Sequence, residues 1–236
     1  MSVEALTALA PDLWVATRPL RLPVGDIGAR MTIVRLPNGG LFLHSPVRLD
    51  AETHAALDAL GPVRYVVAPS RLHHLFVGDY ARAYPSARLF GAPGLAKKRT
   101  DLHFDGVLGD EAPLEWRDIL DQHLFRGAPA INEVVFFHRA SRTLILTDLA
   151  FNVTQPGRGR ARMFLALLGA VGRFGPHRLT RLLIRDRAAA KASVRHILSW
   201  DFDRVTMAHG DVLEWDGVQR LVEASPSSAR ILPRLT

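Results

Sequence analysis

Four residues that can bind a metal ion stand at the ends of apolar segments far apart in the chain. The adjacent His73 and His74, then Asp148, then His209 each close a run of apolar residues with strand character. Strand ends that converge on one edge of a sheet are where open α/β folds build their sites. Imidazole and carboxylate groups are ligands for zinc, manganese and iron. The pattern therefore predicts a metal site assembled from three strand ends.

The residue types present exclude several other chemistries. The chain has no cysteine, which rules out disulfides, thiolate catalysis and cysteine-bound metals. There is no Gly-x-Ser-x-Gly elbow for a serine hydrolase, no phosphate-binding P-loop and no dinucleotide-binding glycine motif. Any metal must be held by His, Asp or Glu.

Hydrophobic periodicity indicates the elements that position these residues. Strands at 30–36 and 41–44 flank the turn Pro37-Asn38-Gly39-Gly40, and Asp50 is suited to cap a helix at 50–60. Further strands are expected at 13–16, 63–67, 87–91, 134–138, 143–147 and 204–208, and further helices at about 75–84, within 158–199 and at about 217–224.

This order of elements favours an α/β sandwich with the helices outside and the sheets inside. No linker, repeat or low-complexity tract interrupts it. We expect one domain over residues 1–236, with a helical, arginine-rich insertion around 156–199.

The chain resembles the metallo-β-lactamase-fold superfamily, and within it a divergent branch known as DUF4336. The resemblance covers nearly the whole chain, and the segments that carry it are Leu41–Pro46, Val66–His74, Arg142–Asp148 and Met207–Gly210. It implies an αββα sandwich whose site lies where the strand ends meet.

The usual metal-binding motif of that superfamily is His-x-His-x-Asp-His. Its two leading histidines fall on Pro69 and Arg71, and a further histidine, usual in a later turn, falls near 127–129, where no ligand exists. The resemblance therefore implies that the first of two metals is lost.

The positions of the second metal all retain a possible ligand. These positions are His73, His74, Asp148 and His209. The resemblance implies one divalent metal, with zinc favoured and manganese or iron as alternatives. We expect Asp148 and Arg71 to take part in catalysis, with Arg71 binding an anionic group of the substrate. Alternatively, Arg71 fills the lost site and pairs with Asp148.

Other polar residues were weighed as ligands. Glu133 is a candidate for a substitute carboxylate, and His44 is expected to be structural. His103, His123 and His138 are expected in loops or at the surface, not in the site.

Two functions follow from this reading. The first is a mononuclear metal-dependent hydrolase of a small, anionic ester, thioester, amide or phosphoester. The second is a non-catalytic protein with a vestigial site that binds a partner or an anionic ligand through its basic helices. An oxygen-using iron enzyme at the same ligands is a third alternative.

The formal net charge of +7 arises largely from arginines between 158 and 195. Such a surface favours anionic partners, although no nucleic-acid-binding motif accompanies it. The apolar stretch 162–174 predicts a buried helix, a cap over the site, or an oligomer or membrane-surface contact. With neither a signal-like start nor a long apolar run, we expect a cytoplasmic protein without a transmembrane segment.

Overall fold

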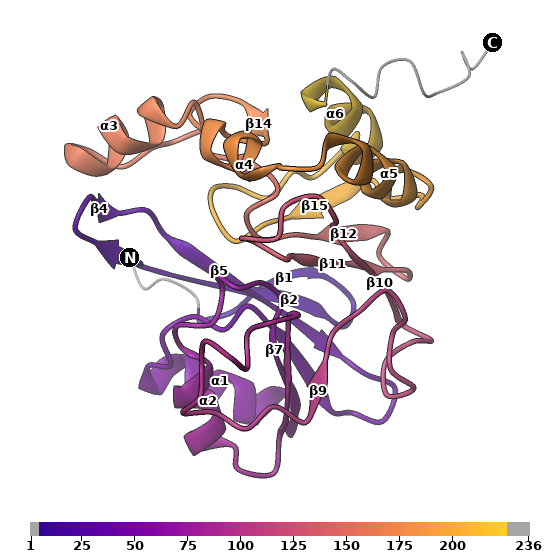
Figure 1. The fold of residues 1–236 in the computed structure, drawn as a ribbon. Coiled ribbons are helices and arrows are strands. Elements are labelled where there is room, and N and C mark those ends of the chain that lie inside the picture. The colour runs from indigo at the N-terminus through magenta and orange to yellow at the C-terminus, as the bar shows by residue number, and fades with distance from the viewer. Residues whose placement is uncertain (1–4, 226–236) are drawn as a thin grey trace.

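The computed structural model describes residues 5–225, and it arranges them as two β-sheets packed face to face between helices (Figure 1). The ends of the predicted domain, 1–4 and 226–236, lie outside the described residues. The first sheet has the strand order β1-β2-β5-β6-β7-β8-β9, and the second has the order β10-β11-β12-β15. The layers therefore follow the αββα order that the sequence predicts.

The first sheet is formed by the N-terminal half of the chain. Its strands are β1 (Thr7–Ala10), β2 (Leu13–Arg18), β5 (Ala29–Arg35), β6 (Leu41–His44), β7 (Val63–Ala68), β8 (Arg88–Gly91) and β9 (Gly106–Val107). Strands β2, β5 and β6 are antiparallel neighbours, whereas β6, β7, β8 and β9 run parallel. The helices on its outer face are α1 (Ala51–Leu60) and α2 (Val77–Ala83).

The second sheet and its helices come from the C-terminal half. Its strands are β10 (Leu120–Leu124), β11 (Val134–His138), β12 (Thr143–Ile145) and β15 (Arg204–Thr206). Helices α5 (Arg187–Leu198) and α6 (Gly217–Ala224) pack on its outer face. Two small hairpins lie apart from the main sheets: β3 (Arg21–Leu22) with β4 (Gly25–Asp26), and β13 (Phe151–Asn152) with β14 (Phe174–Gly175).

Alternation along the strands explains why two sheets form. In β5, Ile33 packs with the helices α1 and α2, whereas its neighbour Val34 faces the space between the sheets. In β6, Leu41 and Leu43 take the helix side and Phe42 the sheet side. Strand residues alternate between faces, so a strand that is apolar at every position has both faces buried.

The core between the sheets is built around aromatic rings. Phe42 meets Trp116 and Phe136 edge to face, with ring centroids 5.0 and 5.4 Å apart. The indole nitrogen of Trp116 donates a hydrogen bond to Gln122 at 3.1 Å. Edge-to-face packing and a satisfied indole are the stable arrangement for buried aromatic residues.

Most predicted elements are confirmed within a residue or two, but one expectation changes. Of the three readings of the stretch 162–174, the buried helix is wrong: the helix there is α3 (Arg160–Leu167), which buries only Ala161 and Leu165. It ends early because Gly169 adopts a left-handed conformation, with φ of +67°. A second short helix, α4 (Arg178–Leu183), follows β14.

The helix α1 is capped as the sequence predicts. Asp50 accepts hydrogen bonds from the Thr53 amide at 2.8 Å and from Arg18 Nε at 2.7 Å, and Arg18 is 7% exposed. Burial alone would raise the pKa of Asp50, but the Arg18 and Thr53 hydrogen bonds lower this pKa to about 2.

Asp50→Ala is expected to lower the free energy of unfolding by about 2–3 kcal/mol, because a helix cap is lost and the charge of Arg18 loses its nearest partner. The contribution of Asp50 should be present above the unfolded pKa of roughly 4 and lost as the pH falls toward 2. Urea unfolding of both proteins across this range measures it. Glu52→Ala, in the same turn but 3.9 Å from Arg18 and 59% exposed, is the matched control and should cost less than about 0.5 kcal/mol. Equal costs for the two variants would contradict this account.

Candidate metal centre

Three of the four predicted ligands meet at one edge of the sandwich. His73 follows β7, Asp148 follows β12 and His209 follows β15. Because β12 runs parallel to β15, the carboxyl ends of these two strands lie at one edge of the second sheet, and the loop after β7 of the first sheet meets them there. One ligand atom from each of the three residues lies within 4.8 Å of the others.

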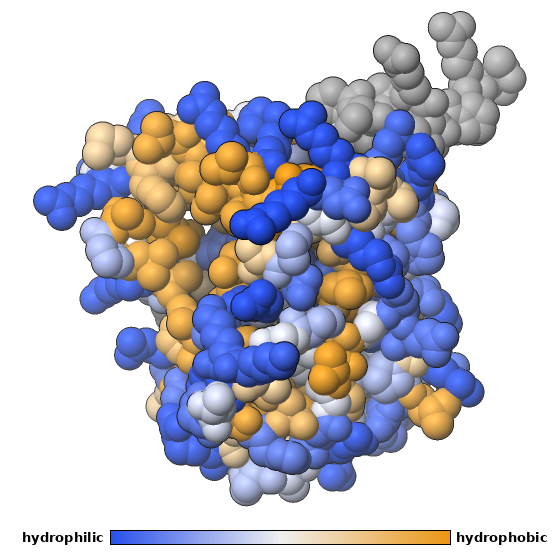
Figure 2. All heavy atoms as spheres, in the orientation of Figure 1, coloured by the Kyte–Doolittle hydropathy of each residue, from blue (hydrophilic) through white to orange (hydrophobic). Residues whose placement is uncertain are grey.

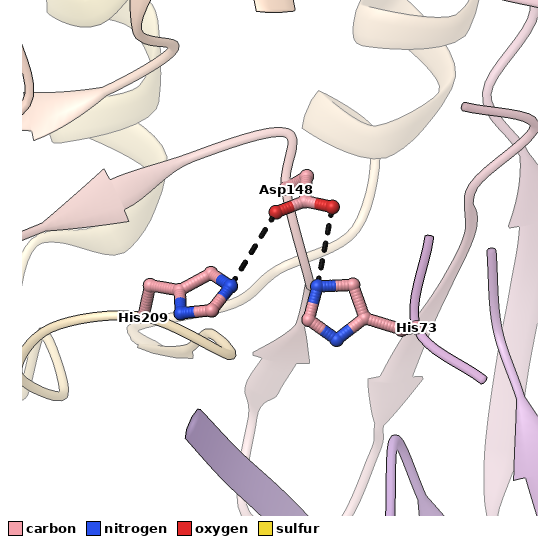
Figure 3. A group of neighbouring side chains, drawn as sticks. All are labelled: His73, Asp148 and His209. Atoms are coloured by element: carbon pink, nitrogen blue, oxygen red, sulfur yellow. Dashed lines mark ion pairs between the residues drawn. The ribbon is translucent and has the colours of Figure 1, made fainter. Parts of the chain in front are cut away.

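The Asp148 carboxylate lies between the two imidazoles (Figure 3). His73 Nε2 is 3.1 Å from Asp148 Oδ2, and His209 Nε2 is 3.7 Å from Asp148 Oδ1. The ring centroids of the histidines are 5.3 Å apart. Both imidazoles thus direct their Nε2 atoms toward the Asp148 carboxylate.

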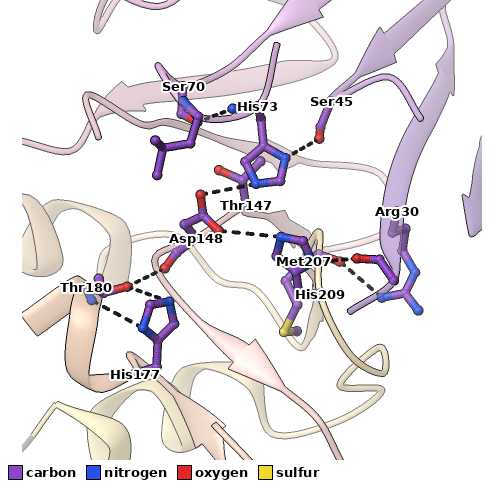
Figure 4. Close-up of polar contacts among 12 residues, drawn as sticks. Arg30, Ser45, Ser70, His73, Thr147, Asp148, His177, Thr180, Met207 and His209 are labelled. Atoms are coloured by element: carbon purple, nitrogen blue, oxygen red, sulfur yellow. Dashed lines mark hydrogen bonds and ion pairs between the residues drawn. The ribbon is translucent and has the colours of Figure 1, made fainter. Parts of the chain in front are cut away.

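Hydrogen bonds on the far side of each ring fix these orientations (Figure 4). His209 Nδ1 donates to the Gly28 carbonyl at 2.7 Å, which leaves its Nε2 lone pair for a ligand. The Ser45 hydroxyl lies 2.8 Å from His73 Nδ1 and can accept from it. Such outer hydrogen bonds are the usual means of orienting metal-binding histidines.

Glu133 holds the loop that carries Asp148. Its carboxylate accepts hydrogen bonds from the backbone amides of Thr147, Asp148 and Leu149, at 2.5, 2.8 and 3.0 Å. Burial and the nearby Asp148 carboxylate raise the pKa of Glu133 to about 7. Both of its oxygens are engaged with the backbone, so Glu133 is not the substitute ligand considered from the sequence.

The other side of this loop is held by a residue pair that sequence reasoning missed. The Thr180 hydroxyl donates to the Asp148 carbonyl at 2.8 Å, and His177, at the start of α4, contacts Thr180 through both ring nitrogens. No local motif marks these residues, because their role depends on α4 packing against the loop.

The charge around the cluster is unusual for a buried carboxylate. Asp148 is 7% exposed, and among the described residues its ion pairs are with His73 and His209. Burial would raise the pKa of Asp148, but His73 and then His209 lower it to about 2. Burial would lower the pKa of His73, but Asp148 outweighs this effect and raises it. Burial lowers the pKa of His209 to about 4.

The donor set fits a divalent metal. Two imidazole nitrogens and one carboxylate, with space left for a fourth partner, are a common ligand set for catalytic zinc. Among the described residues the buried carboxylate has no Lys or Arg partner, so its charge is balanced either by a protonated His73 or by a bound metal ion.

His74 is not brought into this group. Its Nδ1 lies 3.2 Å from Arg99 Nη1, which also donates to the His74 carbonyl at 2.7 Å. Burial, with Lys98 and Arg99 nearby, lowers the pKa of His74 to about 4. The chain turns between the two adjacent histidines, so only His73 faces Asp148.

Arg71 also lies outside the cluster. Its Nη1 donates to the Pro129 carbonyl at 3.1 Å, and its backbone amide donates to the Ile131 carbonyl at 2.8 Å. Within residues 5–225 no ion pair joins Arg71 to Asp148, so the alternative in which these two residues pair is wrong. Arg71 instead links its own loop to the turn at 127–129. These are the two segments in which the resemblance places the missing ligands of the first metal.

Three further histidines, His44, His123 and His138, pack within the fold, and the last two are more buried than expected. His123, in β10, lies 3.0 Å from Asp110 and stacks on His196. His138, in β11, is 2% exposed and bonds Ser141 Oγ at 2.7 Å. His44 is buried against Phe136, and burial lowers its pKa to about 3.

A cleft of about 180 Å³ leads to the cluster. The described residues that line it include no Lys or Arg. Apart from His73, His74, Asp148, His209 and Ser45 these residues are apolar: Leu20, Leu22, Ile27, Ala29, Pro46, Leu72, Leu75 and Phe76. The cationic side chain expected to bind a substrate anion is therefore absent from the cleft.

Solved structures share this fold. Metallo-β-lactamases from Hirschia baltica and Erythrobacter litoralis superpose with TM-scores of 0.61 and 0.66, each at 16% identity. The matches cover 98% of both chains for the first, and 94% of this chain and 96% of the other for the second. The mono-zinc form of the metallo-β-lactamase FIM-1 from Pseudomonas aeruginosa gives 0.65 at 13% identity, covering 96% of each chain. These likenesses show that the protein has the metallo-β-lactamase fold.

A family model defines the family to which the chain belongs. The model for DUF4336, a domain of unknown function, matches residues 13–158, which is more than half of the chain, and the protein belongs to this family. A search of curated proteins gives no significant match.

Proposed function

We propose that the protein is a mononuclear metal-dependent hydrolase. The observation that carries this proposal is the convergence of His73, Asp148 and His209 at the base of a cleft, each from a different strand end. One structural neighbour, FIM-1, is described as a mono-zinc form, so a protein of this fold can hold a single zinc ion. Zinc is the favoured ion, with manganese and iron as alternatives.

The residues of the chain divide the work as follows. His73 and His209 present their Nε2 atoms, oriented by Ser45 and Gly28, and Asp148 supplies the negative charge. When bound, the metal would polarise the scissile carbonyl or phosphoryl group and lower the pKa of a water toward about 7. The apolar cleft walls limit access of bulk water and leave little to hold a charged group there.

The cleft lining also bears on the substrate. With Arg71 turned toward Pro129 and no Lys or Arg in the lining, an ester or thioester with an apolar chain beside the scissile bond fits better than an anion bound in the cleft. Anionic character, if the substrate has it, would lie outside the cleft.

Metal content of the purified protein is the first test. We expect about one equivalent of zinc, manganese or iron, lost in His209→Ala, and hydrolysis of nitrophenyl esters that requires the metal. His74→Ala is the matched control: it removes a neighbouring imidazole of the same cleft but keeps the cluster, and should retain the metal. A protein without metal, which is not stabilised against heat by added metal, would refute the hydrolase.

The non-catalytic alternative has one observation in its favour. Asp148 and His73 approach to 3.1 Å, so a protonated His73 can neutralise the buried carboxylate without a metal. Under that alternative His209→Ala would leave metal content and thermal stability in excess metal unchanged.

A further inference from the structure

Helices α3 and α4 carry large apolar side chains that face solvent. Met163 and Leu167 of α3 are each 69% exposed, and Leu179 and Leu182 of α4 are 42% and 79% exposed. Figure 2 shows a broad apolar area over these two helices, surrounded by hydrophilic side chains. Contiguous exposed apolar area of this kind marks an interaction surface.

The same segment is strongly and uniformly cationic. Residues 149–185 contain seven arginines and no Asp, Glu or Lys: Arg158, Arg160, Arg162, Arg173, Arg178, Arg181 and Arg185. Arg173 and Arg178 donate to the carbonyls of Gly169 and Leu167, which brings them close to the exposed apolar side chains.

The mixture of charge and apolar surface selects one kind of partner. A second copy of the same face would set arginines against arginines, which is unfavourable. A nucleic acid would engage the arginines but not the exposed Met163, Leu167 and Leu182. An anionic lipid bilayer satisfies both, because its headgroups attract arginine and its acyl region accepts apolar side chains.

The face continues to the mouth of the cleft. Leu22, Leu72 and Leu75 line the cleft and are 37%, 43% and 57% exposed. Strand β4, in the hairpin that carries Leu22, contacts α3 so closely that a Cβ on Gly25 would lie 3.0 Å from the Cβ of Ala161. The cleft lip and α3 are therefore parts of one surface.

We propose that the α3–α4 face binds the surface of an anionic membrane and that the cleft opens beside it. Binding to the bilayer is independent of catalysis. The consequence for substrate class rests on the proposed function: the hydrolase would act on an ester or thioester with an acyl chain that partitions into the bilayer.

Co-sedimentation of the full chain with vesicles tests the binding. We expect the protein to sediment with vesicles of phosphatidylcholine mixed with phosphatidylglycerol, and not with phosphatidylcholine alone. Met163→Ser/Leu167→Ser should weaken partition at least about tenfold, because two exposed apolar side chains no longer enter the bilayer. A separate double variant, Arg160→Gln/Arg162→Gln, should weaken partition into anionic vesicles by roughly tenfold relative to the unaltered protein.

Leu114→Ser is the matched control. Leu114 is 71% exposed but lies between β9 and β10, outside both helices and the cleft, and its replacement should leave partition unchanged. A melting temperature like that of the unaltered protein shows that each variant is folded.

Three outcomes would overturn the proposal: no sedimentation with anionic vesicles at low salt, equal losses in the α3 and Leu114 variants, or a dimer in light scattering that the α3 variant dissociates. None of these measurements requires metal or turnover, so membrane binding and the hydrolase can fail separately.

Discussion

Replacing Asp148 with asparagine is expected to abolish metal binding and, with it, metal-dependent hydrolysis. Asp148 is the single carboxylate of the three-residue cluster, and its two oxygens face His73 and His209 at 3.1 and 3.7 Å. Asparagine keeps the shape but removes the charge that offsets a dication. Loss of an outer hydrogen-bond partner costs about 10- to 100-fold in metal affinity, and loss of a ligand should cost more.

Competition with a chromophoric chelator measures this affinity, and nitrophenyl ester hydrolysis measures the activity. Asp121→Asn is the matched control, because Asp121 pairs with Arg139 at the surface of β10, away from the cluster. If the Asp148 variant bound metal as tightly as the unaltered protein, the three-residue cluster would not be the metal centre.

The convergence of this cluster was predictable because strand order and direction leave little choice. Apolar runs that end in His73, Asp148 and His209 can fill the interior of a sandwich only as strands, and parallel neighbours end at a common edge. The local sequence thus predicts which residues can meet, because the apolar pattern identifies the strands. In β5, for example, Ile33 faces the helices and Val34 faces the other sheet.

The predictions that place His74 and Arg71 in the site fail because the direction of a side chain within a loop cannot be derived from local sequence. His73 and His74 are equivalent by residue type, and only the hydrogen bonds of Ser45 to one and Arg99 to the other separate them. Likewise, Arg71 reaches Pro129 because residues 127–131 pack beside its loop, a contact 58 residues away in sequence. Such long-range contacts leave no periodic signal in the sequence.

The distribution of cations changes the expected mode of substrate binding. The sequence suggested that Arg71 would bind an anion in the site, whereas the cleft lining has no Lys or Arg and the arginines of 149–185 lie around the exposed apolar side chains of α3 and α4. Arginines outside an apolar cleft can attract an anionic membrane surface, but they do not line the cleft and so are not placed to bind an anionic group of a substrate inside it. Within residues 5–225 no helix is both long and apolar enough to cross a bilayer.

The second large effect is expected at Glu133, which touches the cluster only through the backbone. Glu133→Ala would leave the amides of Thr147, Asp148 and Leu149 without their acceptor inside the core. A buried amide left without an acceptor costs about 1–3 kcal/mol, and allowing for relaxation we expect the three together to lower the free energy of unfolding by roughly 3–5 kcal/mol. Denaturant unfolding of the metal-free protein measures this loss.

Glu133→Ala should also show whether Glu133 positions the metal ligand Asp148 or only stabilises the fold. Because Glu133 sets the direction of the Asp148 loop, metal affinity measured on folded protein should fall about 10- to 100-fold. Glu133→Gln keeps one acceptor oxygen and should recover part of both effects. Glu115→Ala is the matched control, since Glu115 pairs with Arg88 outside the site. Unchanged metal affinity in a destabilised Glu133→Ala protein would assign Glu133 to the fold alone. A parallel loss, partly restored by glutamine, would show that this buried carboxylate positions the metal ligand.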